Sequence, residues 1–125
     1  MAVMIVSCSG SVYLDIGRHR LKRNDYEGAK RYLEKAMTSF ERDGDIEGVV
    51  LSLLHLTEVN IAMRNMQEAE ECSKKALNIA MDHKITHYIP YCYNSLGIAK
   101  LISGSDKTKG VHYLVKSLEH LIAEK

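Results

Sequence analysis

Apolar residues recur along this chain at the three- and four-residue spacing of amphipathic helices, in six successive segments. Short polar or glycine-containing turns separate the segments, and the strict alternation typical of strands is missing from the sequence. The pattern therefore predicts an all-α protein, with helices over about residues 11–23, 24–42, 46–63, 66–81, 86–102 and 106–122.

Residues suited to helix ends stand between these segments. Side chains that can accept hydrogen bonds from free backbone N–H groups precede five of the six helices, at Asp25, Asp45, Asn65, Thr86 and Asp106. Glu68 follows Asn65 as in a capping box, and Gly44 suits a left-handed turn at the end of the second helix. Pro90 is expected in the first turn of the fifth helix.

One stretch of the chain recurs. The segment Tyr26–Met37 returns as Met66–Leu77, and each copy has two alanines seven residues apart, close to two helical turns. In the third copy glycine and serine replace the alanines, with offsets of forty and forty-one residues between copies. Such units bury their faces only by stacking, so we predict three antiparallel hairpins over about residues 11–43, 45–83 and 86–122. Residues 1–10 would be an apolar lead-in or a helix extension to a single domain over residues 11–125.

The residues of the repeat resemble the tetratricopeptide repeat (TPR) family from about Ser11 to the end of the chain. The first unit matches at Tyr13, Ile16, Gly17, Tyr26, Ala29, Leu33 and Ala36, and the third at Leu96, Gly97 and Gly104. The second unit departs from the pattern, because Thr57 replaces the glycine and Ser73 an aromatic residue. The forty-residue spacing exceeds the usual thirty-four and resembles peptide-pheromone receptors, kinesin light chains and Pins-like scaffolds. The resemblance implies an α-α solenoid, a right-handed superhelical stack.

The resemblance also implies a function, which is non-catalytic binding of a protein or peptide in a concave groove lined by the first helix of each hairpin. The groove residues would be Leu14, Asp15, Arg18, Lys22, Leu51, His55, Glu58, Ala62, Tyr91, Asn94, Ser95 and Ile98. A guanidinium can pair with a carboxylate through two hydrogen bonds, and an asparagine can both donate to and accept from a peptide backbone. The alternative for each residue is an ordinary solvated or packing role.

Relatives that clamp acidic chaperone tails use several Lys, Arg and Asn residues in this groove. Here the matching positions hold Leu14, Arg18, His55, Tyr91 and Ser95, and only the arginine fits that ligand. The expected ligand is therefore a partly apolar peptide with one acidic group. The chain would then be the ligand-sensing part of a larger regulatory protein.

The net charge, the length of the apolar runs and the cysteine spacing indicate which partners and which location to expect. The chain has 125 residues, a formal net charge of +1 and no apolar run near the ~20 residues of a membrane span. We expect neither nucleic acid nor membrane as partner, and the basic run of residues 18–23 fits the cationic end of a helix. Three cysteines without paired spacing favour free thiols and a cytoplasmic location. The run Ile5–Cys8 resembles a lipoprotein signal, but it lacks a basic region and is short.

Catalytic and metal motifs are weak in this sequence. His83 and His87 straddle a predicted turn, and His112 and His120 share a helix face without a nearby carboxylate or thiol. No phosphate-binding loop is present, and we expect no cofactor, no metal and no enzymatic activity. A cysteine–histidine pair formed in space is left open, although Cys72 and Cys92 fit small core residues better.

A second function remains possible from the sequence, a structural module that self-associates. Both ends of the predicted stack are apolar, with Ala2–Val6 at one end and Val111, Val115, Leu118 and Ile122 at the other. Uncovered apolar faces of this kind favour a homo-oligomer formed through the terminal helices, or a missing flanking domain.

Overall fold

The computed structural model describes residues 2–123, and their side chains from residue 9 onward. In this part of the chain there are six α-helices and one 3-10 turn, and no strand, so the all-α prediction is confirmed. The elements are α1 (Ala2–Lys22), α2 (Tyr26–Asp43), α3 (Ile46–Ala62), α4 (Met66–Asp82), η1 (Thr86–Tyr88), α5 (Ile89–Ser103) and α6 (Lys107–Ala123).

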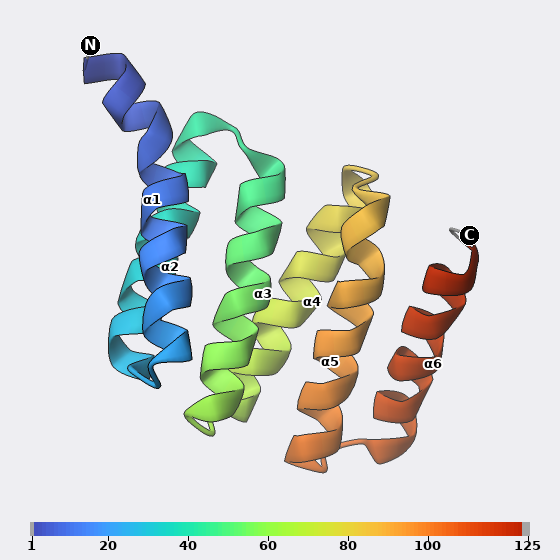
Figure 1. Cartoon of the computed structure of the whole chain (residues 1–125). Helices are drawn as coiled ribbons and strands as arrows, with labels where there is room; N and C mark the ends of the chain where they lie inside the picture. Colours follow the sequence, from blue (N-terminus) through green and yellow to red (C-terminus); the bar gives the residue numbers. More distant parts are fainter. Residues whose placement is uncertain (1, 124–125) are drawn as a thin grey trace.

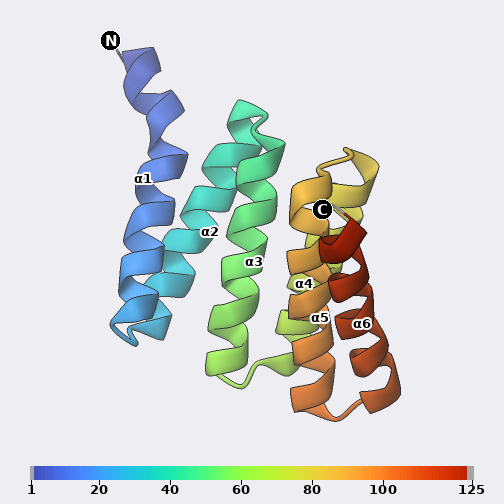
Figure 2. The same ribbon diagram turned by 45° about the vertical axis from the view of Figure 1, so that its right-hand side comes forward.

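The helices pack in the order of the chain. Each helix packs on the one before it and the one after it, and α3 also contacts both α1 and α5. Figures 1 and 2 show α1 and α6 at opposite ends of the row. The buried side chains of α2, α3, α4 and α5 form one continuous core, in which α3 is covered on several sides. This explains why α3 is apolar over most of its circumference.

Small residues allow the paired helices to approach closely. Ala29, Ala36, Ala69 and Ala76 are completely buried. A Cβ atom added to Gly17 would lie 2.8 Å from Cγ of Leu33, and one added to Gly97 would lie 2.9 Å from the carbonyl oxygen of Gly110. The repeated stretch is therefore part of the packing between helices.

Several predicted helix ends are confirmed. Asp25 and Asp45 accept hydrogen bonds from backbone N–H groups three residues later, at 3.1 and 3.0 Å. Asp106 does the same for the backbone N–H of Lys109 at 3.0 Å. Gly44 has φ +73°, a left-handed conformation that a side chain rarely adopts.

Two predicted caps and one boundary are wrong. Asn65 precedes α4 but makes no side-chain cap bond, and Glu68 instead pairs with Lys30 of α2 at 3.0 Å. Thr86 does not cap α5, because a helix starting there would need an N–H group on Pro90, which proline lacks. The chain forms the 3-10 turn first, and Pro90 falls in the first turn of α5 as expected. α5 therefore begins at Ile89 and not at residue 86. α1 begins at Ala2, so residues 2–10 extend the first helix, which is one of the two alternatives expected for residues 1–10.

Candidate functional site

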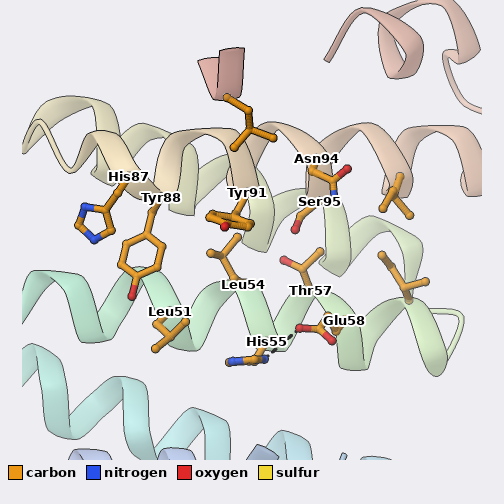
Figure 3. A pocket seen from close by; sticks show the side chains of 13 residues that line it. Leu51, Leu54, His55, Thr57, Glu58, His87, Tyr88, Tyr91, Asn94 and Ser95 are labelled. Carbon is orange, nitrogen blue, oxygen red and sulfur yellow. Dashed lines mark hydrogen bonds and ion pairs between the residues drawn. The ribbon is translucent and has the colours of Figure 1, made fainter. Parts of the chain in front are cut away.

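A groove of about 840 Å³ lies between α3 and α5. Its lining comes from α3, from the 3-10 turn, from α5 as far as Ile98, and from one residue of α6 (Figure 3). The lining residues are Leu51, Leu54, His55, Thr57, Glu58, Ile61, His87, Tyr88, Tyr91, Asn94, Ser95, Ile98 and Leu121. From Leu51 to Ile61 a helix rises about 15 Å, the length of roughly five residues of extended peptide.

The periodicity of the two helices produces this lining. On α3, Leu51, His55 and Glu58 follow one another at spacings of four and three residues and share a face. On α5, Tyr91, Asn94, Ser95 and Ile98 recur in the same way, while the residues between them pack into the core. α3 and α5 contact each other much less than each of them contacts α4, and the groove lies between them.

Aromatic and aliphatic side chains form most of the groove surface. Tyr91 is 56% exposed, and it projects over the groove toward Leu54 (Figure 3). Tyr88 extends toward Leu51 at one end of the groove. A tyrosine in this setting offers a large apolar face together with a hydroxyl group that reaches water.

Some polar groups of the groove already have hydrogen-bond partners within the protein, and others have none in the part of the chain that the structure describes. Nδ1 of His55 lies 2.9 Å from a carboxylate oxygen of Glu58, and the buried Thr57 hydroxyl donates to the Leu53 carbonyl oxygen at 2.9 Å. By contrast, the side chains of Asn94 and Ser95 have no hydrogen-bond partner among the described residues. These two side chains are therefore available to a ligand.

The groove carries acidic but not basic charge. Its lining holds one carboxylate, Glu58, and neither lysine nor arginine. A second carboxylate, Glu47, lies 3.8 Å from the imidazole of His87 at the end of the groove. An anionic ligand would thus meet no fixed positive charge here, whereas a cationic group would meet a carboxylate.

Seven of the twelve predicted groove residues line this groove: Leu51, His55, Glu58, Tyr91, Asn94, Ser95 and Ile98. All of them come from the second and third units. That they bind a ligand stays a prediction.

The remaining five residues lie elsewhere. Leu14 is only 7% exposed and belongs to the core, since α1 turns that side toward its neighbours. Asp15, Arg18 and Lys22 are exposed on α1 but do not line the groove, and neither does Ala62 near the end of α3. Arg18, which was expected to pair with an acidic group of the ligand, is thus not part of this groove.

Six lining residues were missed: Leu54, Thr57, Ile61, His87, Tyr88 and Leu121. Leu54 and Ile61 share a helical face with Leu51 and Glu58, and this spacing could have identified them. His87 and Tyr88 were missed because α5 was predicted to begin before them, and the 3-10 turn redirects their side chains. Nothing in the sequence pattern places Leu121 of the last helix beside α3.

The cysteine thiols are poorly suited to nucleophilic chemistry. Burial raises the pKa of the Cys92 thiol to about 12, and burial also raises the pKa of the partly buried Cys72. Both thiols are free and protonated at neutral pH. Cys8 lies outside the described side chains. Within the described residues, no three His, Cys, Asp or Glu side chains converge as a metal site would require.

The basic run at the end of α1 is partly paired within the fold. Arg20 contacts a carboxylate oxygen of Asp25 at 2.7 Å and lies over the ring of Tyr32. This hydrogen bond lowers the pKa of Asp25 and raises the pKa of Arg20. None of the helices within residues 2–123 is both long and apolar enough to cross a membrane.

Comparison of the chain with protein-family models found no match, and comparison with curated proteins found none either.

Proposed function

We propose that this chain is a non-catalytic binding module that holds a segment of a partner protein in the groove between α3 and α5. The proposal includes a right-handed stack of TPR-like hairpins in the cytoplasm, in which the first helices of the hairpins face the ligand. The observation on which it rests is the open, largely apolar groove with two unoccupied polar side chains, Asn94 and Ser95.

The dimensions and chemistry of the groove favour a peptide over a small metabolite. An extended peptide presents apolar side chains to Tyr91 and the surrounding leucines, while its backbone amide groups can bond to Asn94. The raised pKa values of the two described thiols favour a binding role over a catalytic one.

The charge of the groove changes the ligand expected from the sequence. With Glu58 in the lining and Arg18 outside it, the partner segment should be apolar with a basic residue rather than an acidic one. A tail rich in acidic residues should be excluded for the same reason.

The test begins with selection of short peptides from a random phage-displayed library against the whole chain. For a selected peptide, Tyr91→Ala should raise the dissociation constant about 30-fold, since an aromatic contact at the centre of an interface is worth about 2 kcal/mol. Asn94→Ala should raise it about fivefold, the value of one net hydrogen bond of about 1 kcal/mol.

The matched control is Asn78→Ala, which removes an exposed asparagine on α4, outside the groove. Its affinity should equal that of the wild type. If Tyr91→Ala and Asn94→Ala bind every selected peptide as tightly as Asn78→Ala does, the groove is not the binding site and the proposal fails.

A further inference from the structure

The outer face of α6 bears an uncovered apolar stripe. Val111, Val115, Leu118 and Ile122 are 51%, 45%, 59% and 71% exposed. They follow one another at separations of four, three and four residues, which places them on one side of the helix. α6 is the last described helix and stands at the end of the row (Figure 2).

Comparison of α6 with α2 and α4 shows which position of this stripe is buried in the inner hairpins. Leu118 corresponds to Met37 in α2 and Leu77 in α4, which pack into the core beneath the following hairpin. The same position on α6 would thus be covered if a further hairpin of this kind followed.

At the other three stripe positions the inner hairpins carry charged residues, with the single exception of Met81 in α4. Val111, Val115 and Ile122 correspond to Lys30, Glu34 and Glu41 in α2, and to Glu70, Lys74 and Met81 in α4. Lys30 and Glu70 form ion pairs with the next hairpin, and the other four are exposed. The position of Val111 would therefore also be covered by a following hairpin, whereas Val115 and Ile122 would stay exposed. A following hairpin would thus leave part of the apolar stripe of α6 uncovered.

We propose that α6 packs antiparallel against α6 of a second copy of this chain, around a two-fold axis. The separations of four, three and four read the same in both directions. An antiparallel pair therefore places Val111 against Ile122 of the second copy, and Val115 against Leu118 of the second copy.

The polar groups beside the stripe are complementary in this arrangement, because an imidazole N–H group can donate a hydrogen bond to a carboxylate. His112 and Glu119 are both exposed and flank the stripe on the side away from α5. In the antiparallel register, His112 of one copy meets Glu119 of the other, and this contact occurs twice in the dimer.

The mass of the full chain in solution tests this inference, measured by sedimentation equilibrium over a range of concentrations. The wild type should reach twice the 14.1 kDa mass of one chain. Leu118→Asp should raise the dimer dissociation constant by about 30-fold or more, as expected for loss of a central apolar contact. The matched control is Met81→Asp, at an exposed apolar residue of α4 that is 51% exposed, and it should leave the dimer intact.

The register is tested by exchanging charge. His112→Glu alone should weaken the dimer, because the new carboxylate would face that of Glu119 in the other copy, and adding Glu119→Lys should restore the dimer. Circular dichroism of each variant confirms that the helices are retained. A wild type that stays monomeric, or a dimer that survives Leu118→Asp, overturns the inference. If the double variant fails to restore the dimer, the antiparallel register is wrong.

Discussion

At the scale of single residues, the contact between the two helices of each hairpin depends on side-chain volume. Gly17 faces Leu33 in the first hairpin, and Gly97 faces Leu114 in the third. In the second hairpin Thr57 and Ser73 occupy the corresponding positions, and both are completely buried. The larger residue on one helix is thus matched by a smaller one on the other, which explains why the second hairpin differs from the first and third at these positions.

The first prediction concerns Gly97→Ala. Glycine to alanine in a helix ordinarily stabilises a protein by up to about 1 kcal/mol. Here the added Cβ would lie 2.9 Å from both the Gly110 carbonyl oxygen and Cγ of Leu114. The backbone cannot move aside as a flexible side chain can, so we expect a net loss of about 1–3 kcal/mol in the free energy of unfolding.

Urea denaturation followed by circular dichroism measures this loss. Asn78→Ala serves as the control, since it also introduces an alanine into a helix, but at an exposed position. A Gly97→Ala variant as stable as the wild type would show that α5 and α6 are less closely packed than described.

At the scale of elements, the helices differ in whether a side chain reaches the free backbone N–H groups at their start. Asp45 does so at the start of α3, whereas Asn65 at the start of α4 does not. Both residues were equally good candidates from the sequence. The other half of the capping box is also missing, because the Glu68 carboxylate pairs with Lys30 of α2.

These two positions give a matched pair of substitutions. Asp45→Ala should lower the free energy of unfolding by about 1 kcal/mol, because the backbone N–H of Gly48 loses its acceptor. Asn65→Ala should have a clearly smaller effect, because no side-chain bond is lost. Thermal unfolding of both variants checks the difference, and equal losses at the two positions would contradict it.

At the scale of the whole molecule, the groove results from the way the second and third hairpins stack. α3 and α5 supply most of its lining, and Leu121 reaches it from α6 although it lies sixty residues from Ile61 in the sequence. The stacking determines which side chains meet, and hence that Glu58 rather than Arg18 gives the groove its charge.

The corresponding prediction compares Glu58→Gln with Arg18→Ala, using a selected peptide that contains one lysine. Glu58→Gln should weaken binding about two- to fivefold, the usual value of an exposed ion pair. Arg18→Ala should leave the affinity unchanged, since its side chain lies outside the groove. Fluorescence anisotropy gives both dissociation constants.

The control for this comparison is Glu41→Gln, which removes an exposed carboxylate on α2. Replacing the peptide lysine with glutamine should abolish the effect of Glu58→Gln. A loss of affinity in Arg18→Ala with no change in Glu58→Gln would restore the acidic ligand expected from the sequence.

The sequence by itself determined the helical class, the six helices and most of their ends. These features depend on local interactions, which are the periodic burial of one helix face, side-chain caps such as Asp25 and Asp45, and the left-handed turn at Gly44. The resemblance to the repeat family indicated the side of α3 and α5 on which seven of the groove residues lie.

Only the tertiary structure decided which of these faces form the groove. Periodicity places residues on the same side of one helix, but it does not tell how far neighbouring helices stand apart. The resemblance to the repeat family thus implied a role for Leu14, which α1 buries in the core, and gave no indication of Leu121. The sequence pattern also placed Thr86 at a helix cap that Pro90, four residues later, prevents. The positions of Leu14 and Leu121 depend on contacts between helices that are distant in sequence. The failure of the cap at Thr86 depends on which backbone groups can form hydrogen bonds. The periodicity of apolar residues along one helix contains neither kind of information.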